Sequence, residues 1–158
     1  MTDPRIEILL RGLDQAFDRR SWHGPNLMNA IRGVDAEEAA WRPEPGRHNV
    51  WELVLHAAYW KYRVYRLLTE EPPRSFDVKG SNFFARPTAE HRDWQGDVEI
   101  LKGWHARLRQ AVAGFDPARL DQPCGQRENS GYALISGAAF HDVYHAGQIR
   151  LLRRMREG

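Results

Sequence analysis

The stretch "FHDVYHAGQIRLLRR" (residues 140–154) places two histidines in a regular apolar row. Steps of four and three residues select a helix face of the kind that packs against other helices, and the row reads Leu134, Ala138, His141, His145, Gln148, Leu152 and Met155. Aliphatic side chains suit such a face, whereas an imidazole buried without a partner costs about 1–3 kcal/mol. The two histidines therefore need a purpose inside the protein.

The same helical spacing recurs outside this stretch, and no segment alternates as a strand would. Capping residues and prolines predict four helices at about 4–20, 49–69, 88–115 and 132–158, the third beginning at Thr88. The connections are 33–49, with one short helical turn at 36–41, and two long segments rich in turn residues, 70–87 and 115–131. We predict an all-α protein, a four-helix bundle in which residues 1–158 form a single domain.

Composition narrows the functional class. The chain has 158 residues, of which 42% are hydrophobic and 28% charged, as in ordinary globular proteins. A net charge of +2 is too small to argue for nucleic acid as a partner. Cys124 is the single cysteine, so no disulfide can form within the chain. No segment approaches the ~20 apolar residues of a membrane span, and the N-terminal segment lacks the pattern of a signal peptide. We expect a cytoplasmic protein without membrane or nucleic-acid partners.

Three histidines have the arrangement of metal ligands. His141 and His145 are spaced i, i+4, so both side chains can reach one ion from the same helix. His56 lies in the middle of the 49–69 helix and faces the bundle or its seam. Two facing helices would then supply three imidazoles to one ion, and three histidines with open coordination positions are typical of catalytic sites. Zn²⁺, Ni²⁺, Fe²⁺, Co²⁺ and Cu²⁺ all suit neutral nitrogen ligands, and Mn²⁺ suits them less.

Two further residues are candidates for the chemistry of such a site. Gln148 continues the apolar row and can donate or accept a hydrogen bond. Glu52 lies one turn before His56 and could orient a histidine or handle a proton. The alternative role of Glu52 is structural, because Asn49 and Glu52 have the spacing of a capping box.

The remaining histidines and the cysteine have simpler interpretations. His105 lies on the apolar face of the 88–115 helix, where a core histidine is the ordinary case, and Cys124 lies in the 115–131 connection. A metal site closed by four protein ligands would need a fourth ligand, which His105 or Cys124 would have to supply. We interpret His23, His48 and His91 as exposed or locally hydrogen-bonded.

Two segments together resemble a known family. They are "NVWELVLHAAYWKYRVYRLL" (49–68) and "AAFHDVYHAGQIRLLRR" (138–154), and they are similar to the DinB/YfiT-like family, also called DinB_2 or damage-inducible-like. The resemblance extends over most of the chain and is least distinct over residues 70–130. It implies an up-down-down-up four-helix bundle, a divalent metal held by His56, His141 and His145, and a homodimer. It does not imply DNA binding.

The resemblance leaves the reaction open. Characterised relatives include thiol-dependent transferases and hydrolase-like members, so we expect a metal-dependent enzyme, either a thiol S-transferase or a hydrolase, acting on a small molecule. A low-molecular-weight thiol would be a further cofactor, and Arg47 and Arg63 are candidates for binding an acidic one, although surface solvation also explains both. The alternative is a non-catalytic metal-binding module of a stress response. A plain bundle with buried histidines and no metal is the third interpretation.

Overall fold

The computed structural model describes residues 3–70, 75–86, 90–125 and 128–158, apart from the side chain of His91. Helices account for the regular structure in these ranges, and the one β-type contact in them is an isolated bridge between Pro123 and Ser130. The helices are α1 (Pro4–Phe17), α2 (Leu27–Ala30), α3 (Ala36–Ala40), α4 (Val50–Thr69), α5 (His91–Ala113), the 3₁₀ turn η1 (Pro117–Arg119) and α6 (Gly131–Glu157). The predicted all-α class is confirmed.

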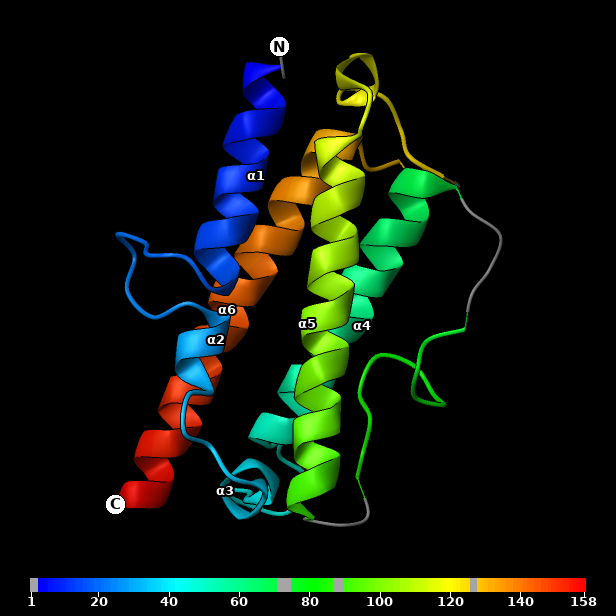
Figure 1. The fold of residues 1–158 in the computed structure, drawn as a ribbon. Coiled ribbons are helices and arrows are strands. Elements are labelled where there is room, and N and C mark those ends of the chain that lie inside the picture. Colours follow the sequence, from blue (N-terminus) through cyan, green and yellow to red (C-terminus); the bar gives the residue numbers. More distant parts are fainter. Residues whose placement is uncertain (1–2, 71–74, 87–89, 126–127) are drawn as a thin grey trace.

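The four long helices form a bundle with an up-down-down-up topology. In Figure 1, α1 and α6 run in one direction, while α4 and α5 run in the other. Because α4 and α5 are parallel, the chain between them must return along the full length of the bundle, and the segment that contains residues 75–86 descends beside α4 to do so. The short helix α2 lies below α1 and beside α6, while α3 lies at the end of the bundle where α4 begins (Figure 1).

Side-chain caps explain where the predicted helices begin. The Asn49 side chain accepts a hydrogen bond from the Glu52 backbone N–H, as the capping pattern predicted for the start of α4. Ser130 caps α6 in the same way through Ala133. The third helix differs from the prediction, because α5 begins at His91 behind Glu90, which makes no side-chain cap. Thr88, the predicted cap, lies outside the described residues.

Helix α4 is the central helix of the bundle and is buried on nearly every side. The spacing of its apolar residues predicted one packed face, yet every residue from Val50 to Tyr59 is buried in the structure. It contacts α5, α6 and α3, and the crossing segment covers the remaining side, because Phe76 and Phe84 pack against Tyr59. Periodicity alone could not indicate this, since a loop distant in sequence provides the extra cover.

The buried row of α6 is displaced by one residue from the predicted one. Ile135, Asp142 and Ile149 are fully buried, whereas Met155 is 52% exposed. Leu134, His141, Gln148 and Leu152 are half-buried and lie at the edge of the packed face. Ala138 and His145 of the predicted row are buried as predicted, so the row forms one edge of the packed face rather than its centre.

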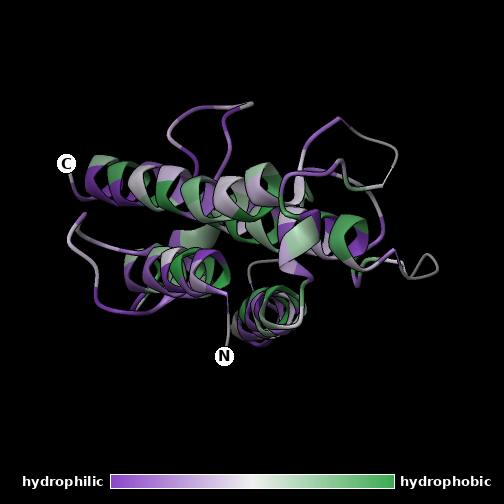
Figure 2. Cartoon of the chain, turned by 90° about the horizontal axis from the view of Figure 1, so that it is seen from above, coloured by the Kyte–Doolittle hydropathy of each residue, from purple (hydrophilic) through white to green (hydrophobic). Residues whose placement is uncertain are grey.

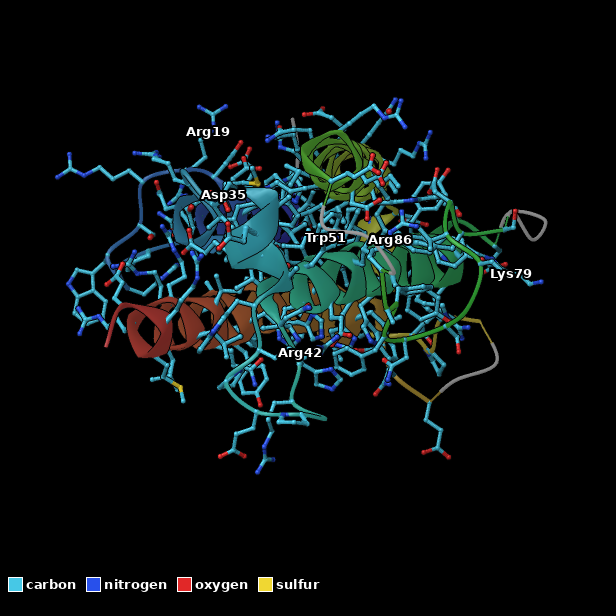
Figure 3. All side chains as sticks on the ribbon, turned by 90° about the horizontal axis from the view of Figure 1, so that it is seen from below. Arg19, Asp35, Arg42, Trp51, Lys79 and Arg86 are labelled. Atoms are coloured by element: carbon cyan, nitrogen blue, oxygen red, sulfur yellow. The ribbon has the colours of Figure 1, made fainter. Side chains whose placement is uncertain are left out.

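The buried apolar side chains of the described residues form two clusters. One surrounds the first half of α4 together with α2, α3 and the first half of α5, and the other contains α1, the first half of α6 and the last turns of α4 and α5. The connecting loops are mostly hydrophilic, while each long helix alternates between hydrophilic and hydrophobic residues (Figure 2). Trp51 of the first cluster and Arg86 lie close together in Figure 3. Each donates a 2.7 Å hydrogen bond to Oδ2 of Asp97.

None of the helices in the described ranges combines the length and the apolar character that crossing a membrane requires.

Candidate metal centre

Helices α4 and α6 bring three histidines to one point. His56 comes from the middle of α4, and His141 and His145 from successive turns of α6. The Nε2 atom of His141 lies 3.1 Å from Nε2 of His56 and 3.0 Å from Nε2 of His145. One nitrogen from each ring lies within 4.8 Å of the other two. The fold thus brings together the three histidines that the sequence singled out.

Two of the rings are held by hydrogen bonds on their far side. His56 Nδ1 lies 2.9 Å from the backbone oxygen of Asn82, and His145 Nδ1 lies 2.6 Å from Oε1 of Gln148. Since these oxygens only accept, each Nδ1 carries the hydrogen and donates it. The Nε2 atoms of both neutral rings therefore present lone pairs toward His141. Metal-bound histidines characteristically have such a partner behind them.

The donor set fits a divalent metal ion better than it fits a set of hydrogen bonds. A neutral His141 has at most one Nε2–H to offer two facing lone pairs, so hydrogen bonding alone leaves one of them unsatisfied. Burial, followed by the charges of the neighbouring histidines, lowers the pKa of His141 to about 3, and burial lowers that of His56 to about 4. Burial also lowers the pKa of His145. All three rings are neutral at pH 7, as metal ligation requires.

The two residues considered as a fourth ligand lie elsewhere. His105 is buried in the bundle, where its ring stacks on Phe17 with 3.7 Å between ring centroids. Cys124 is buried in the second apolar cluster. In the part of the chain that the structure describes, the group of potential metal ligands consists of the three histidines. Such a group would leave coordination positions for a ligand from solution.

The three histidines line a pocket of about 590 Å³, whose walls come mainly from α4 and α6. Its walls are mostly aliphatic and aromatic, with His48 and Gln148 as the polar residues besides the three histidines, and the remaining lining residues are Leu53, Phe83, Tyr144, Leu151 and Leu152. A pocket of this kind suits a small molecule with an apolar part.

Neither arginine considered for an acidic thiol lines this pocket. Arg47 is exposed and pairs with Glu44 at 3.7 Å. Arg63 lies over the ring of Tyr59 and borders a separate cavity of about 160 Å³ between α4 and α6. His141 also borders that cavity, so Arg63 and one histidine of the group line the same cavity.

The structure adds three residues that the sequence did not indicate. Asn82 supplies the backbone oxygen for His56, and Phe83 stacks between two imidazoles, 4.1 Å from His56 and 3.8 Å from His48. His48 lines the pocket rather than standing apart from it. The one signal in the sequence was that His48 precedes Glu52 by four residues, a spacing at which the two side chains can meet. Nothing in the sequence could indicate that residues 82 and 83 return to α4.

Glu52 combines the two roles between which the sequence left a choice. Its backbone N–H donates the capping hydrogen bond to the Asn49 side chain. Its carboxylate accepts hydrogen bonds from Arg42 and lies 2.9 Å from His48 Nδ1. Burial raises the pKa of Glu52, but the bonds from Arg42, His48 and the Asn49 backbone outweigh it and lower the pKa overall. The carboxylate is therefore ionised at pH 7 and orients His48.

The fold and this histidine group define a helical-bundle protein with a buried three-histidine site compatible with metal binding. The family model DinB_2, described as the DinB superfamily, matches residues 19–149, and the chain belongs to that superfamily. No curated protein and no solved structure matches the sequence.

Proposed function

We propose that this protein binds one divalent transition metal through Nε2 of His56, His141 and His145 and acts as a metal-dependent enzyme on a small molecule. One observation carries the proposal: three neutral imidazoles converge beside a pocket, and the described residues provide no fourth ligand. A structural metal site would be closed by four protein ligands, whereas this group leaves room for substrate.

A bound divalent ion would lower the pKa of a thiol or a water molecule and so supply a nucleophile near neutral pH. Asn82 and Gln148 hold two of the imidazoles in the required orientation. Phe83, Leu151 and Leu152 give the pocket apolar walls that suit the apolar part of a small substrate. Thiol transfer with a low-molecular-weight thiol is the reaction we favour, because the resemblance supports it, and hydrolysis is the second.

The first test is the metal content of tag-free protein by mass spectrometry. We expect about one divalent ion per chain, lost in His145→Ala and retained in His105→Phe, a change to a buried histidine outside the group. Wild-type protein that contains no metal and takes up neither Zn²⁺ nor Ni²⁺ would rule out the proposal.

The alternative, a non-catalytic metal-binding module, differs in one measurable property. Protein loaded with Co²⁺ has a visible spectrum that depends on the ligands of the ion. If 2-mercaptoethanol changes that spectrum, an open position is present and the enzyme proposal gains support. An unchanged spectrum would favour the non-catalytic module.

Two further expectations belong to this proposal. A cytoplasmic location agrees with the single cysteine. A homodimer is supported by the outer face of α6, on which Phe140, Tyr144 and Leu151 are 72%, 64% and 60% exposed.

A further inference from the structure

The pocket beside the three histidines contains a fourth imidazole that belongs to a different arrangement. His48 lies just before α4, lines the pocket, and leaves 49% of its side chain exposed. It is not a member of the ligand group. An exposed histidine is usually free to rotate, yet this one is held on two sides.

One constraint is a buried carboxylate. His48 Nδ1 lies 2.9 Å from Oε2 of Glu52, whose side chain is 8% exposed. Arg42 fixes the carboxylate from the other side with both of its terminal nitrogens, one of them 3.0 Å from Oε2, and Figure 3 shows Arg42 beside the first part of α4. Because the carboxylate is ionised, His48 Nδ1 donates its hydrogen to it, and Nε2 presents the lone pair.

The other constraint is an aromatic ring. Phe83 stacks on His48 with an interplanar angle of 9° and on His56 with one of 10°. The two imidazoles therefore lie on opposite faces of one phenyl ring and point into the same pocket region. The carboxylate sets the direction of Nε2 and the phenyl ring sets the plane of the imidazole.

His48 Nε2 itself has no hydrogen-bond partner among the residues that the structure describes. It lies on the edge of the ring opposite Glu52, and the pocket borders this residue. A buried carboxylate on Nδ1 fixes the tautomer and the orientation in which Nε2 can accept a proton, which is the arrangement of a general base with its orienting acid. If this cluster served only to hold the segment before α4 in place, the Arg42–Glu52 pair would be enough. A structural role would not require a histidine that faces the pocket.

We propose that His48 is a catalytic proton acceptor and donor for a thiol bound in this pocket, with Glu52 and Arg42 as positioning residues. The inference rests on the proposed function. The thiol S–H bond breaks, its electron pair stays on sulfur and forms the bond to the electrophilic carbon of the second substrate, and the proton forms an N–H bond at His48 Nε2. That proton then passes to the leaving group, which departs with the electron pair of its bond to the same carbon.

The rate of thiol binding tests this role without a known second substrate. Co²⁺-loaded protein is mixed with 2-mercaptoethanol at pH 7.5 in a stopped-flow instrument, and the absorbance of the metal–thiolate bond reports how fast the thiol loses its proton. A general base speeds such a proton transfer by about 100-fold or more. We expect His48→Gln to form the thiolate about 100-fold more slowly than the wild type, added imidazole to restore part of that rate, and Glu52→Gln to give an intermediate rate.

His23→Gln is the matched control, because His23 is an exposed histidine outside this pocket, and it should behave as the wild type. Equal rates of thiolate formation in wild type and His48→Gln, with thiol bound in both, would overturn the role of His48 and leave the proposed function standing. Failure of 2-mercaptoethanol to bind Co²⁺-loaded wild type would overturn the proposed thiol chemistry, and the inference with it.

A second measurement does not depend on the variants. Nitrogen-15 NMR of histidine-labelled wild type reports the tautomer of each neutral ring. We expect the Nδ1–H form for His48 and a mixture of forms in Glu52→Gln. A predominant Nε2–H form in the wild type would place the hydrogen on the wrong atom and overturn the assignment.

Discussion

Lys61 and Asp142 form an ion pair in the middle of the bundle, with side chains 2% and 1% exposed. Oδ1 of Asp142 is buried and has no hydrogen-bond partner among the described residues, so Lys61 is its main compensation. Removing one member of a buried pair leaves an uncompensated charge, whereas removing both leaves an apolar core.

We therefore predict that Lys61→Met lowers the free energy of unfolding by about 3–5 kcal/mol, and that Lys61→Met with Asp142→Leu recovers most of the loss. Urea unfolding of the wild type, the single variant and the double variant measures both effects. A single variant as stable as the wild type would show that the pair contributes no net stability.

His105 predicts a pH dependence of stability. Burial, together with the charges of Lys61 and Arg109, lowers its pKa to about 3, from about 6.5 in the unfolded chain. As the pH falls below about 6.5, His105 becomes protonated in the unfolded chain but stays neutral in the native protein. The native state therefore loses stability progressively down to pH 3, and the loss from this ring at pH 5 is about 2 kcal/mol.

His105→Phe should remove that contribution while keeping the stack on Phe17. Between pH 7 and pH 5, its unfolding free energy should fall by about 2 kcal/mol less than that of the wild type. Urea unfolding at the two pH values measures the difference, with His23→Gln as the exposed control. Equal pH dependence in wild type and variant would contradict the neutral assignment of His105.

At the scale of elements, the crossing segment 75–86 determines the geometry of the site. The parallel arrangement of α4 and α5 requires a long return, and this return delivers the Asn82 oxygen and the Phe83 ring to His56. Asn82 has a φ of 64°, a left-handed conformation that asparagine and glycine tolerate and β-branched residues do not. The position of the carbonyl therefore depends on the residue type.

Asn82→Val should strain this turn and displace the carbonyl oxygen, and we predict a Zn²⁺ affinity about 10- to 100-fold below that of the wild type. Asn82→Gly keeps the backbone conformation and loses the side-chain bond to Trp60, so its affinity should stay close to the wild-type value. Competition with a chromophoric chelator measures both. An unchanged affinity in Asn82→Val would mean that the oxygen of residue 82 does not orient His56.

The helices and the crossing segment were not equally predictable. The starts of α4 and α6 followed from Asn49 and from the turn residues before Gly131, because a cap acts within three residues of the chain. The start of α5 did not, because Glu90 provides no side-chain cap. The contacts of residues 76–84 depend on α4, which is distant in sequence, and no local pattern encodes them.

At the scale of the whole molecule, a polar layer divides the core. Lys61, His105 and Asp142 lie where the two apolar clusters meet, one on each of α4, α5 and α6. The histidine group lies beside this layer, because His141 precedes Asp142 on α6. The Lys61–Asp142 ion pair joins α4 to α6 beside the candidate metal centre, and His105 of α5 stacks on Phe17 in the same layer.

The outer face of α6 predicts assembly. If two copies pair through this face, Phe140→Glu should halve the mass measured by light scattering at micromolar concentration, because it places a charge in the apolar contact. Ala106→Glu, which adds the same charge at an exposed position of α5, should leave the mass unchanged. A wild type that is already monomeric would exclude the homodimer under these conditions.

The sequence by itself determined the helical class, the extents of most helices and the identity of the three histidines, because helix periodicity and capping act over a few residues. Only the tertiary structure decided which groups support those histidines. Asn82, Phe83 and the Lys61–Asp142 pair depend on contacts between elements that are far apart in the chain, and whether His48 faces solvent or a pocket depends on Phe83 covering it. Such contacts follow from the packing of the bundle and the return of the crossing segment, which leave no periodic trace in the sequence.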